Sequence, residues 1–336
     1  MRIACAYLQY FERGNKMSKQ LSMMILSYRN IEGIYETLDS VFVQDYDNIE
    51  IVISDDATPD FSSEIDKLRE YIAKNGKENI KNVVINAIEV NGGTVKNINS
   101  AIRACNGEYI KVLAAEDTLS NETVLSDYVA FLEETGLEIC FGKMRGVTPS
   151  GEYVYHLQSS ADDYDELSKY TPEQTLNRLY GRNFLPAPAW CIKKSLFETQ
   201  GLIPEDTRLI EDYPYWLLLA KNGVKFGYLD KVTIDYKMSG ETSSGSYGEV
   251  FMQDMLKVYD IYIFPHDKRY GLLQPLYNAL KRGGLNFYIT RARWKKLTKW
   301  QRFWKAIKYF PFYVYTSILD ARARRKNKKQ AKKREV

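Results

Sequence analysis

Histidine and cysteine, the residues that most often bind zinc in proteins, are scarce in this chain. Only two of the 336 residues are histidine, His156 and His266, which excludes a histidine-rich metal site. The four cysteines are scattered and lack the close pairing that a zinc site needs: Cys5, Cys105, Cys140 and Cys191. A chain of this length buries a core without covalent staples, so isolated cysteines are typical of buried thiols in a reducing compartment.

Long apolar runs and glycine-rich phosphate motifs are also missing. No stretch reaches the roughly 18 consecutive apolar residues of a membrane-spanning helix. Residues 1–16 contain no run of signal-peptide length, so we expect residues 1–18 to be an N-terminal extension, with Met17 as an alternative start. Neither a Walker A sequence nor a G-x-G-x-x-G motif follows a predicted strand, which disfavours ATPases and dinucleotide-dependent enzymes.

Acidic residues are nearly absent from the C-terminal end, where basic residues gather. Residues 291–336 contain 17 Lys and Arg but only two acids, Asp320 and Glu335, although the net charge of the whole chain is only +4. The rest of the chain is therefore net acidic. This balance argues against nucleic acid as a partner, because an acidic surface repels phosphates.

What is present is a regular alternation of strand-like and helix-like segments. Short apolar runs predict buried strands at residues 21–26, 49–53, 83–87 and 109–113. Apolar residues at helical spacing predict helices at 31–44, 62–73, 96–104 and 211–222. Strands that alternate with helices of this length pair in parallel, so we predict an α/β fold with a doubly wound, mostly parallel sheet. Ligands of such sheets bind beyond the carboxyl ends of the strands.

Polar residues gather directly after three of these strands. They are Ser27, Tyr28 and Asn30 after the first strand, Asp55 and Asp56 after the second, and Glu116 and Asp117 after the fourth. These positions would meet at one edge of a parallel sheet and form a site; the alternative is that each cluster caps a helix or closes a turn. Gathered carboxylates repel a bare phosphate, so an anionic ligand here requires a divalent cation. Glu116 and Asp117 are oxygen ligands suited to Mn²⁺ or Mg²⁺.

The order of these motifs resembles the donor half of the family 2 glycosyltransferases, which have the Rossmann-like GT-A fold. The family's first motif is Thr/Ser-Tyr-Asn, and residues 27–30 read SYRN. The second, Asp-Asp-Gly-Ser-x-Asp, is matched by DDATPD at 55–60. The third is matched by Asn91-Gly92-Gly93, with Asn99 on the helix that follows, and NGEYIKVL at 106–113 is similar to the family's next strand.

The resemblance continues to about residue 245. The segment LFETQGLIPED at 196–206 is similar to the family's segment before the acceptor loop, and Glu211-Asp212 to its Glu-Asp-x-x-x-Trp helix. Tyr236-Lys237 and Ser243 match its closing basic, serine-bearing loop. Without the resemblance, Glu211 and Asp212 read as two acids favourably placed in the first turn of a helix.

The resemblance implies an inverting transfer of a sugar from a nucleotide diphosphate, expected to be UDP, to a hydroxyl of a glycan or lipid-linked glycan. Such transfers build surface polysaccharide, lipopolysaccharide or capsule. Asp212 would be the general base, positioned by Glu211, and Glu116 with Asp117 would hold the Mn²⁺ or Mg²⁺ ion. The donor would be bound by Ser27, Tyr28, Asn30, Asp55, Asp56, Asn91, Gly93, Lys96, Asn99 and Ala115. Further candidate site residues are Trp190, Lys237 and Ser243.

The resemblance also divides the chain. We expect residues 19–120 to form the nucleotide-sugar-binding half, 121–245 the acceptor-binding and catalytic half, and 246–336 a C-terminal helical, basic extension. One departure is Ala114, which stands where the family commonly has an Asp. It leaves open a non-catalytic GT-A-fold protein that binds glycan or a partner protein. A sugar nucleotidyltransferase is less favoured, because the glycine-rich phosphate loop of that class is not visible near residues 26–30.

The C-terminal extension has an amphipathic pattern. Large apolar residues recur at spacings of three or four, with Lys and Arg between them: Trp294, Leu297, Trp300, Trp304, Ile307 and Phe310. A helix of this kind lies in a membrane interface, and basic residues attract it to anionic lipid. We therefore expect a cytoplasmic protein bound peripherally to the inner face of the cell membrane through residues 291–336. The alternative is a helix packed on the catalytic domain, followed by a solvated charged end.

Overall fold

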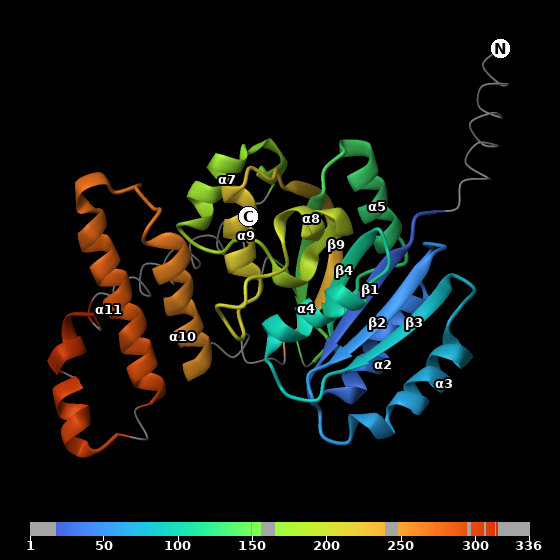
Figure 1. Ribbon diagram of the computed structural model, residues 1–336, viewed down its shortest axis with the longest axis horizontal. Coiled ribbons are helices and arrows are strands. Elements are labelled where there is room, and N and C mark those ends of the chain that lie inside the picture. Colours follow the sequence, from blue (N-terminus) through green and yellow to red (C-terminus); the bar gives the residue numbers. More distant parts are fainter. Residues whose placement is uncertain are drawn as a thin grey trace, which may run out of the picture. The chain divides into compact units, whose positions relative to one another are not determined.

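The chain folds into two compact units of discontinuous sequence (Figure 1). The computed structural model describes residues 18–148, 150–155, 165–238, 248–293, 297–305, 307–312 and 314. Unit 1 comprises Met1–Pro172, Phe184–Leu202 and Asn222–Met238; unit 2 comprises Glu173–Asn183, Ile203–Lys221 and Ser239–Val336. Unit 1 holds the sheet, and the described part of unit 2 is built from helices and loops.

The sheet of unit 1 is mostly parallel, as predicted. Its strands are β1 (Leu21–Ser27), β2 (Ile49–Asp55), β3 (Ile80–Ala87), β4 (Tyr109–Ala114), β5 (Thr118–Leu119), β6 (Ile139–Val147), β7 (Tyr153–Tyr155), β8 (Trp190–Lys193) and β9 (Gly227–Lys237). They lie in the order β3-β2-β1-β4-β8-β6-β9-β5, with β7 paired to β6. The first four pair in parallel, whereas β8 is antiparallel to both of its neighbours. All four predicted strands are confirmed.

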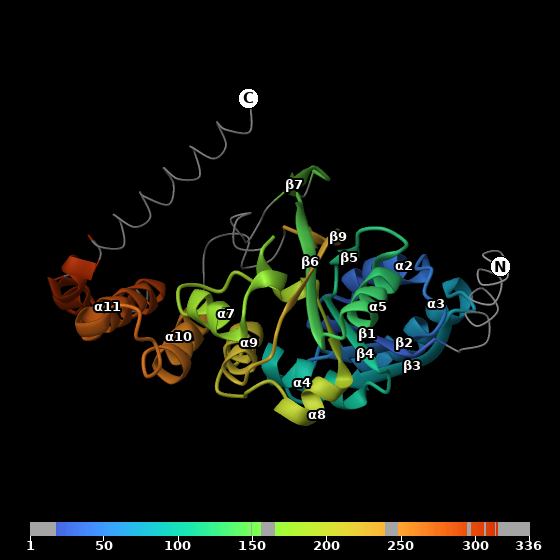
Figure 2. The same cartoon turned by 90° about the horizontal axis from the view of Figure 1, so that it is seen from above.

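Helices cover both faces of this sheet. They are α2 (Ile31–Phe42), α3 (Ile65–Asn75), α4 (Thr94–Ala104), α5 (Val124–Thr135) and α8 (Lys194–Gln200), with short 3₁₀ turns at Phe61–Ser63, Leu167–Lys169 and Ala187–Ala189. Helices α2, α3 and α5 pack into one apolar cluster with β1 and β2. Helix α4 contacts β1, β2 and β3 from the other side, opposite α2 and α5 (Figure 2). The predicted doubly wound arrangement is therefore confirmed.

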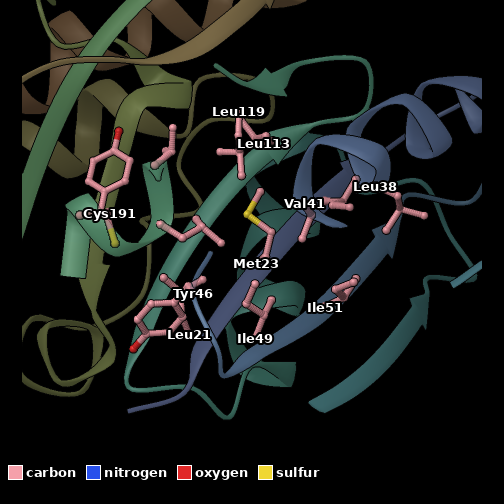
Figure 3. Packing of buried hydrophobic residues seen from close by; sticks show 14 of the residues in the cluster. Leu21, Met23, Leu38, Val41, Tyr46, Ile49, Ile51, Leu113, Leu119 and Cys191 are labelled. Atoms are coloured by element: carbon pink, nitrogen blue, oxygen red, sulfur yellow. The ribbon is translucent and has the colours of Figure 1, made fainter. Parts of the chain in front are cut away.

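The core of unit 1 follows from the alternation of side chains along buried parallel strands. Figure 3 shows Leu21 and Met23 of β1 beside Ile49 and Ile51 of β2, within the cluster that α2 completes. The side chains of these four strand residues are fully buried. Parallel strands buried on both faces consist of nearly continuous apolar residues, which is why the sequence predicted them well.

The parallel register brings the carboxyl ends of the strands together. Ser27 at the end of β1 is the register partner of Asp55 at the end of β2, and Leu26 is the partner of Ala114 at the end of β4. The loops that begin after Ser27, Asp55 and Ala114 therefore start at one edge of the sheet, which we call the carboxyl edge.

Unit 2 is helical in its described part. Its helices are α7 (Pro172–Leu179), α9 (Asp212–Lys221), α10 (Glu249–Val258) and α11 (Gln274–Ala292), with a π-helical turn at Tyr259–Ile263 and a 3₁₀ turn at Gly271–Leu273. Residues 299–305 and 307–312 are also helical, so the expected helical C-terminal region is present. Among the described residues, no helix combines the length and the apolar composition needed to cross a bilayer.

Candidate functional site

Beyond β1 the chain exposes an aromatic ring at the carboxyl edge. Tyr28 is 46% exposed, and the guanidinium of Arg29 lies 5.2 Å from the centroid of its ring. Beside them is an open hollow of about 390 Å³ lined by Arg29, Asn30, Ile31, Glu32, Thr58 and Pro59. An aromatic ring and a guanidinium plane are the surfaces on which planar bases stack. Of these lining residues, sequence reasoning selected only Asn30.

Asn30 links the end of β1 to the loop after β4. Its Oδ1 accepts a hydrogen bond from the N–H of Gly33 (3.1 Å), which caps α2, and its Nδ2 donates to the carbonyl of Ala115 (3.2 Å). The carbonyl of Gly33 in turn accepts the N–H of Glu116 (2.9 Å). A Cβ on residue 33 would lie 2.8 Å from that nitrogen, so only glycine allows α2 to approach the loop this closely.

The two carboxylates at the carboxyl end of β2 are buried and bonded to the surrounding loops. Asp55 accepts hydrogen bonds from the backbone N–H and the hydroxyl of Thr58, both at 2.7 Å. Asp56 accepts the N–H of Gly92 (2.8 Å) with one oxygen and that of Gly93 (2.9 Å) with the other. Both acids therefore fix loop shape, and Asp56 ties the end of β2 to the start of α4.

Helix α4 contributes one residue that sequence reasoning missed. Asn97 is buried; its Oδ1 accepts the hydroxyl of Ser54 (2.6 Å) and its Nδ2 donates to the carbonyl of Ser27 (3.3 Å). It therefore joins the ends of β1 and β2. On the same helix, the predicted Asn99 is also buried and the predicted Lys96 is exposed. The sequence feature that could have pointed to Asn97 is that it is a second asparagine two positions before Asn99.

Ser27 and Asn91 occupy different environments at this edge. The Ser27 side chain is buried, and among the described residues its hydroxyl has no hydrogen-bond partner. A buried hydroxyl without a partner is unfavourable, which points to a group that a ligand satisfies. Asn91 lies on the loop before α4, where its Nδ2 donates to the carbonyl of Asp56 (3.0 Å).

The acidic loop after β4 is held from several sides. The N–H of Ala115 donates to the carbonyl of Leu26 (2.8 Å). Glu116 is half-buried, and Asp117 is buried with its Oδ1 accepting the backbone N–H of Lys237 (3.0 Å). Burial raises the pKa of Asp117 to about 7, against the lowering effect of the Lys237 N–H, and the charge of Glu116 adds to the rise.

Backbone strain is concentrated at this edge. Across the described ranges, the non-glycine residues with left-handed φ are Arg29 (55°), Ala57 (64°), Asp60 (60°) and Glu116 (89°). Each follows a strand whose end reaches the carboxyl edge. An L-residue in this region costs roughly 1–2 kcal/mol, and such residues cluster at ligand sites.

Ala57 offers a direct test of this strain. Ala57→Gly should raise the free energy of unfolding by about 1 kcal/mol, because glycine adopts a φ of 64° without the Cβ clash. The matched control is Ala73→Gly within α3, which should lower it by about 1 kcal/mol because glycine is a poor helix former. Urea unfolding measures both; destabilisation by both substitutions would refute the strain at residue 57.

The carboxyl edge suits a cation that arrives with a phosphate ligand. Among the described residues, no group of three or more His, Cys, Asp or Glu side chains could hold a metal ion alone. Mg²⁺ at phosphate sites is commonly held by one or two carboxylates and completed by phosphate oxygens and water. The adjacent carboxylates of Glu116 and Asp117 fit that partial donor set.

Trp190, Lys237 and Ser243, the further candidates from the sequence, lie in three different situations. Trp190 is buried at the start of β8 and packs edge-on against Phe197, with ring centroids 6.5 Å apart. The ammonium of Lys237 is paired with the carboxylate of Glu36. Ser243 lies outside the described residues.

In unit 2, Glu211 and Asp212 stand at the start of α9. Asp212 accepts the Nδ2 of Asn183 with one oxygen and the N–H of Tyr213 with the other, both at 2.6 Å. Burial raises the pKa of both carboxyls, and the charge of Asp212 raises that of Glu211 further. The Glu211–Asp212 pair therefore loses its protons at a pH much closer to neutral than ordinary carboxylic acids do.

Comparison with known proteins places these features in a family. The model described as Glycosyl transferase family 2 matches residues 22–201. Poly(ribitol-phosphate) beta-N-acetylglucosaminyltransferase TarS of Staphylococcus aureus is 25% identical over 236 residues, which cover 68% of this chain and 37% of TarS. Poly(ribitol-phosphate) beta-glucosyltransferase of Bacillus spizizenii is 33% identical over 135 residues, covering 39% of this chain and 20% of that protein. The chain thus spans less than half of the length of each of these two relatives.

Solved structures share the fold at low sequence identity. The crystal structure of Staphylococcus aureus TarS 1–349 in complex with UDP-GlcNAc has a TM-score of 0.53 and 19% identity, covering 88% of this chain and 89% of that one. The mannosyltransferase PcManGT from Pyrobaculum calidifontis, in complex with GDP-Man and Mn²⁺, has a TM-score of 0.55 and 14% identity, covering 94% of both chains. Both likenesses support the GT-A fold expected from the sequence.

Proposed function

The chain belongs to glycosyl transferase family 2, and from this premise we propose that it transfers a sugar from a nucleoside diphosphate sugar to an acceptor hydroxyl, with inversion at the anomeric carbon. The observation that carries the proposal is the carboxyl edge. There, strained loops after three parallel strands bring Ser27, Tyr28 and Glu116 to one end of the sheet. Doubly wound sheets bind their ligands at this end.

We propose that the donor's nucleotide part occupies the hollow after β1. The exposed ring of Tyr28 and the guanidinium of Arg29 would stack on the base. The buried hydroxyl of Ser27 would gain the partner that it lacks among the described residues by bonding to the ribose or the diphosphate. Asp55 and Asp56 would act by holding the loops of this hollow in shape.

Glu116 and Asp117 would hold a divalent cation, Mn²⁺ or Mg²⁺, that arrives with the diphosphate. When bound, such a cation neutralises the charge that grows on the departing diphosphate. The left-handed backbone of Glu116 supports a role in ligand binding, because a residue kept for stability alone would favour glycine there. Ala114 supplies no carboxylate at the position where the family commonly has one, so the pair would carry this function alone.

Asp212 would take the proton from the acceptor hydroxyl as the bond to the sugar forms. Asn183 and the N–H of Tyr213 each bond to one of its oxygens and fix its orientation. Glu211, whose pKa is raised by burial and by the charge of Asp212, would keep its proton and leave Asp212 as the ionised member of the pair.

We propose a UDP-linked donor and a glycan or polyol-phosphate polymer of the cell surface as the acceptor. The relatives named above support this class, since TarS is named as a poly(ribitol-phosphate) transferase and is solved with UDP-GlcNAc. This chain spans only 37% of TarS, so the products formed with defined acceptors would identify its acceptor.

The test is product analysis with defined donors. UDP-GlcNAc, UDP-Glc and GDP-Man would each be incubated with the protein, Mn²⁺ and a ribitol-phosphate or glycan oligomer, and the released nucleotide measured by chromatography. We expect UDP release that depends on acceptor, and a β-linked product by NMR from the α-linked donor. An α-linked product would contradict inversion, and absence of release from every donor would favour the non-catalytic alternative raised by Ala114.

We also propose that unit 2 binds an anionic membrane surface. The segment from Lys268 to Leu319 contains no Asp or Glu. In the helical residues 299–305 and 307–312, Trp300, Trp304 and Phe310 are 70%, 59% and 63% exposed. At the 3₁₀ turn before α11, Leu272 is fully exposed. Exposed large apolar side chains beside basic residues are typical of interfacial helices. Such binding would place the protein at the cytoplasmic face of the membrane, close to a lipid-linked acceptor.

Membrane binding can be tested with paired charge substitutions. Trp300→Glu combined with Trp304→Glu should weaken binding to vesicles containing phosphatidylglycerol by about tenfold or more, since each large apolar side chain contributes about 1.5–3 kcal/mol when fully buried. Vesicle co-sedimentation is the measurement. Tyr153→Glu with Val154→Glu, an exposed apolar pair in unit 1, is the control and should have no effect. Equal binding by the tryptophan variant would contradict the proposal.

A further inference from the structure

A buried carboxylate of helix α10 holds the loop that leads to Glu211 and Asp212. Asp254 is only 1% exposed, although it lies in the middle of α10. Its Oδ2 accepts two backbone hydrogen bonds, from the N–H of Arg208 (2.8 Å) and from the N–H of Leu209 (2.7 Å). Its Oδ1 lies 3.4 Å from the ammonium of Lys257, one turn further along the helix.

The loop that Asp254 holds has no regular secondary structure and is bonded at several points, one of them between the hydroxyl of Tyr262 and the carboxylate of Asp206. Residues 201–211 contain no helix or strand. The hydroxyl of Thr207 donates to the carbonyl of Ile210 (2.6 Å), and both residues are buried. Two N–H groups on one carboxylate oxygen form a charge-assisted anchor, the stronger class of hydrogen bond. The anchor ends two residues before Glu211.

We propose that Asp254 is a positioning residue for transfer: it fixes the 206–210 loop and thereby the direction in which Asp212 reaches the acceptor hydroxyl. This inference rests on the proposed function, in which Asp212 is the general base. Displacement of such a group by about 1 Å can cost on the order of 10²-fold in rate. All the residues involved belong to unit 2.

The position of Asp254 gives the C-terminal helical region a part in the reaction. Helix α10 packs against α11, and Arg293 at the end of α11 pairs with Glu249 at the start of α10 (2.7 Å). Asp254 therefore connects helices α10 and α11 to the 206–210 loop, which leads to Glu211 and Asp212. The proposed membrane surface continues from these two helices. On this account the C-terminal region is required for transfer as well as for membrane binding.

The experiment compares Asp254→Asn and Asp254→Ala in the full-length chain. Asp254→Ala removes the acceptor of both backbone hydrogen bonds and should lower kcat by about 10–100-fold. Asp254→Asn keeps an oxygen acceptor, so its kcat should fall by less. The KM for the donor and the affinity for UDP, measured by calorimetry, should not change, because the donor-site residues lie in unit 1. The acid limb of the rate–pH profile should shift along the pH axis, because a displaced Asp212 would change its hydrogen bonds to Asn183 and Tyr213 and its burial.

Two further variants serve as controls. Asp260→Asn tests whether any change in this region lowers kcat, and Asp212→Asn tests the proposed function itself. Asp260→Asn, an exposed carboxylate of the same region that pairs with Arg282, should leave kcat unchanged. Unchanged kcat in both Asp254 variants would overturn the inference. The inference would also be overturned if the Asp254 variants lost kcat and UDP affinity to the same extent while the pH profile stayed unchanged. That result would indicate general unfolding. Full activity of Asp212→Asn would instead refute the proposed function.

Discussion

Asp212→Asn should lower the rate of sugar transfer by about 10²–10⁴-fold, the usual contribution of a general base. The substitution keeps the shape of the side chain, and an amide oxygen can still accept the hydrogen bond from the N–H of Tyr213 or from Asn183. The fold of unit 2 should therefore persist. UDP binding should also persist, because the residues proposed to bind the donor lie in unit 1.

The pH dependence of the wild-type rate gives the same residue a second test. A base must be ionised to work, so the rate should fall as the pH is lowered through the pKa of the Glu211–Asp212 pair. Burial raises both pKa values, so this fall should occur well above the value of about 3.9 for an ordinary aspartate. Glu205→Gln, an exposed acid of the preceding loop, serves as the control and should keep the wild-type rate and profile. A fully active Asp212→Asn variant would exclude this residue as the base.

Glu50→Ala should lower the free energy of unfolding by about 3–5 kcal/mol, the largest stability effect expected in unit 1. Glu50 is fully buried on β2. It accepts hydrogen bonds from the hydroxyl of Ser22 (2.5 Å), the Nδ2 of Asn82 (2.8 Å), and both the N–H (2.7 Å) and the Nδ2 (2.8 Å) of Asn106. Each buried donor left without an acceptor costs about 1–3 kcal/mol.

The sign of the pH effect at Glu50 follows from its surroundings. Burial alone would raise its pKa, but the hydrogen bonds from Asn106, Ser22 and Asn82 outweigh burial and lower it. A carboxyl with a lowered folded-state pKa stabilises the fold above its unfolded pKa, and this stabilisation is lost as the pH falls through the folded value. In urea unfolding, the difference between wild type and Glu50→Ala should therefore shrink at acidic pH. The exposed control Glu70→Gln should change stability by no more than about 0.5 kcal/mol. A similar change in both variants would contradict the role of Glu50.

The strands and the site edge were predictable because their signals are local. A strand buried on both faces is a continuous apolar run, so β1, β2 and β4 were found nearly residue by residue. Lys111 within β4 shows the limit of such signals. It is fully buried, and its ammonium donates to the carbonyls of Val112 (2.7 Å) and Pro188 (2.5 Å). Burial lowers the pKa of Lys111 to about 7, which no pattern in the sequence indicated.

Other residues of the site could not be predicted because they depend on contacts between distant segments. Asn97 and Asn99 are two positions apart on α4, and only the packing of the helix shows that Asn97 bonds to the ends of β1 and β2. Asp254 binds a loop about 45 residues earlier in the chain. The hydrophobic pattern of α10 gives no sign of this contact. The cation-binding role of Glu116 was predicted from the carboxylates gathered after the strands, whereas the role of Asp212 as a base came only from the family resemblance; both are proposals.

On our proposal, the carboxyl edge of the sheet binds a nucleoside diphosphate together with a divalent cation. Calorimetric titration of the protein with UDP, GDP, dTDP and CDP, each with and without Mn²⁺, would measure this binding. The matched variant is Glu116→Gly, which removes the carboxylate and also relieves the left-handed backbone, so that loss of binding cannot be attributed to unfolding.

We expect the wild-type chain to bind one nucleotide, UDP, in a Mn²⁺-dependent way. In Glu116→Gly the Mn²⁺ dependence should be lost, while the free energy of unfolding stays equal to or above that of the wild type. Absence of binding by every nucleotide in the wild-type chain would contradict the claim, as would Mn²⁺-dependent binding that Glu116→Gly leaves intact.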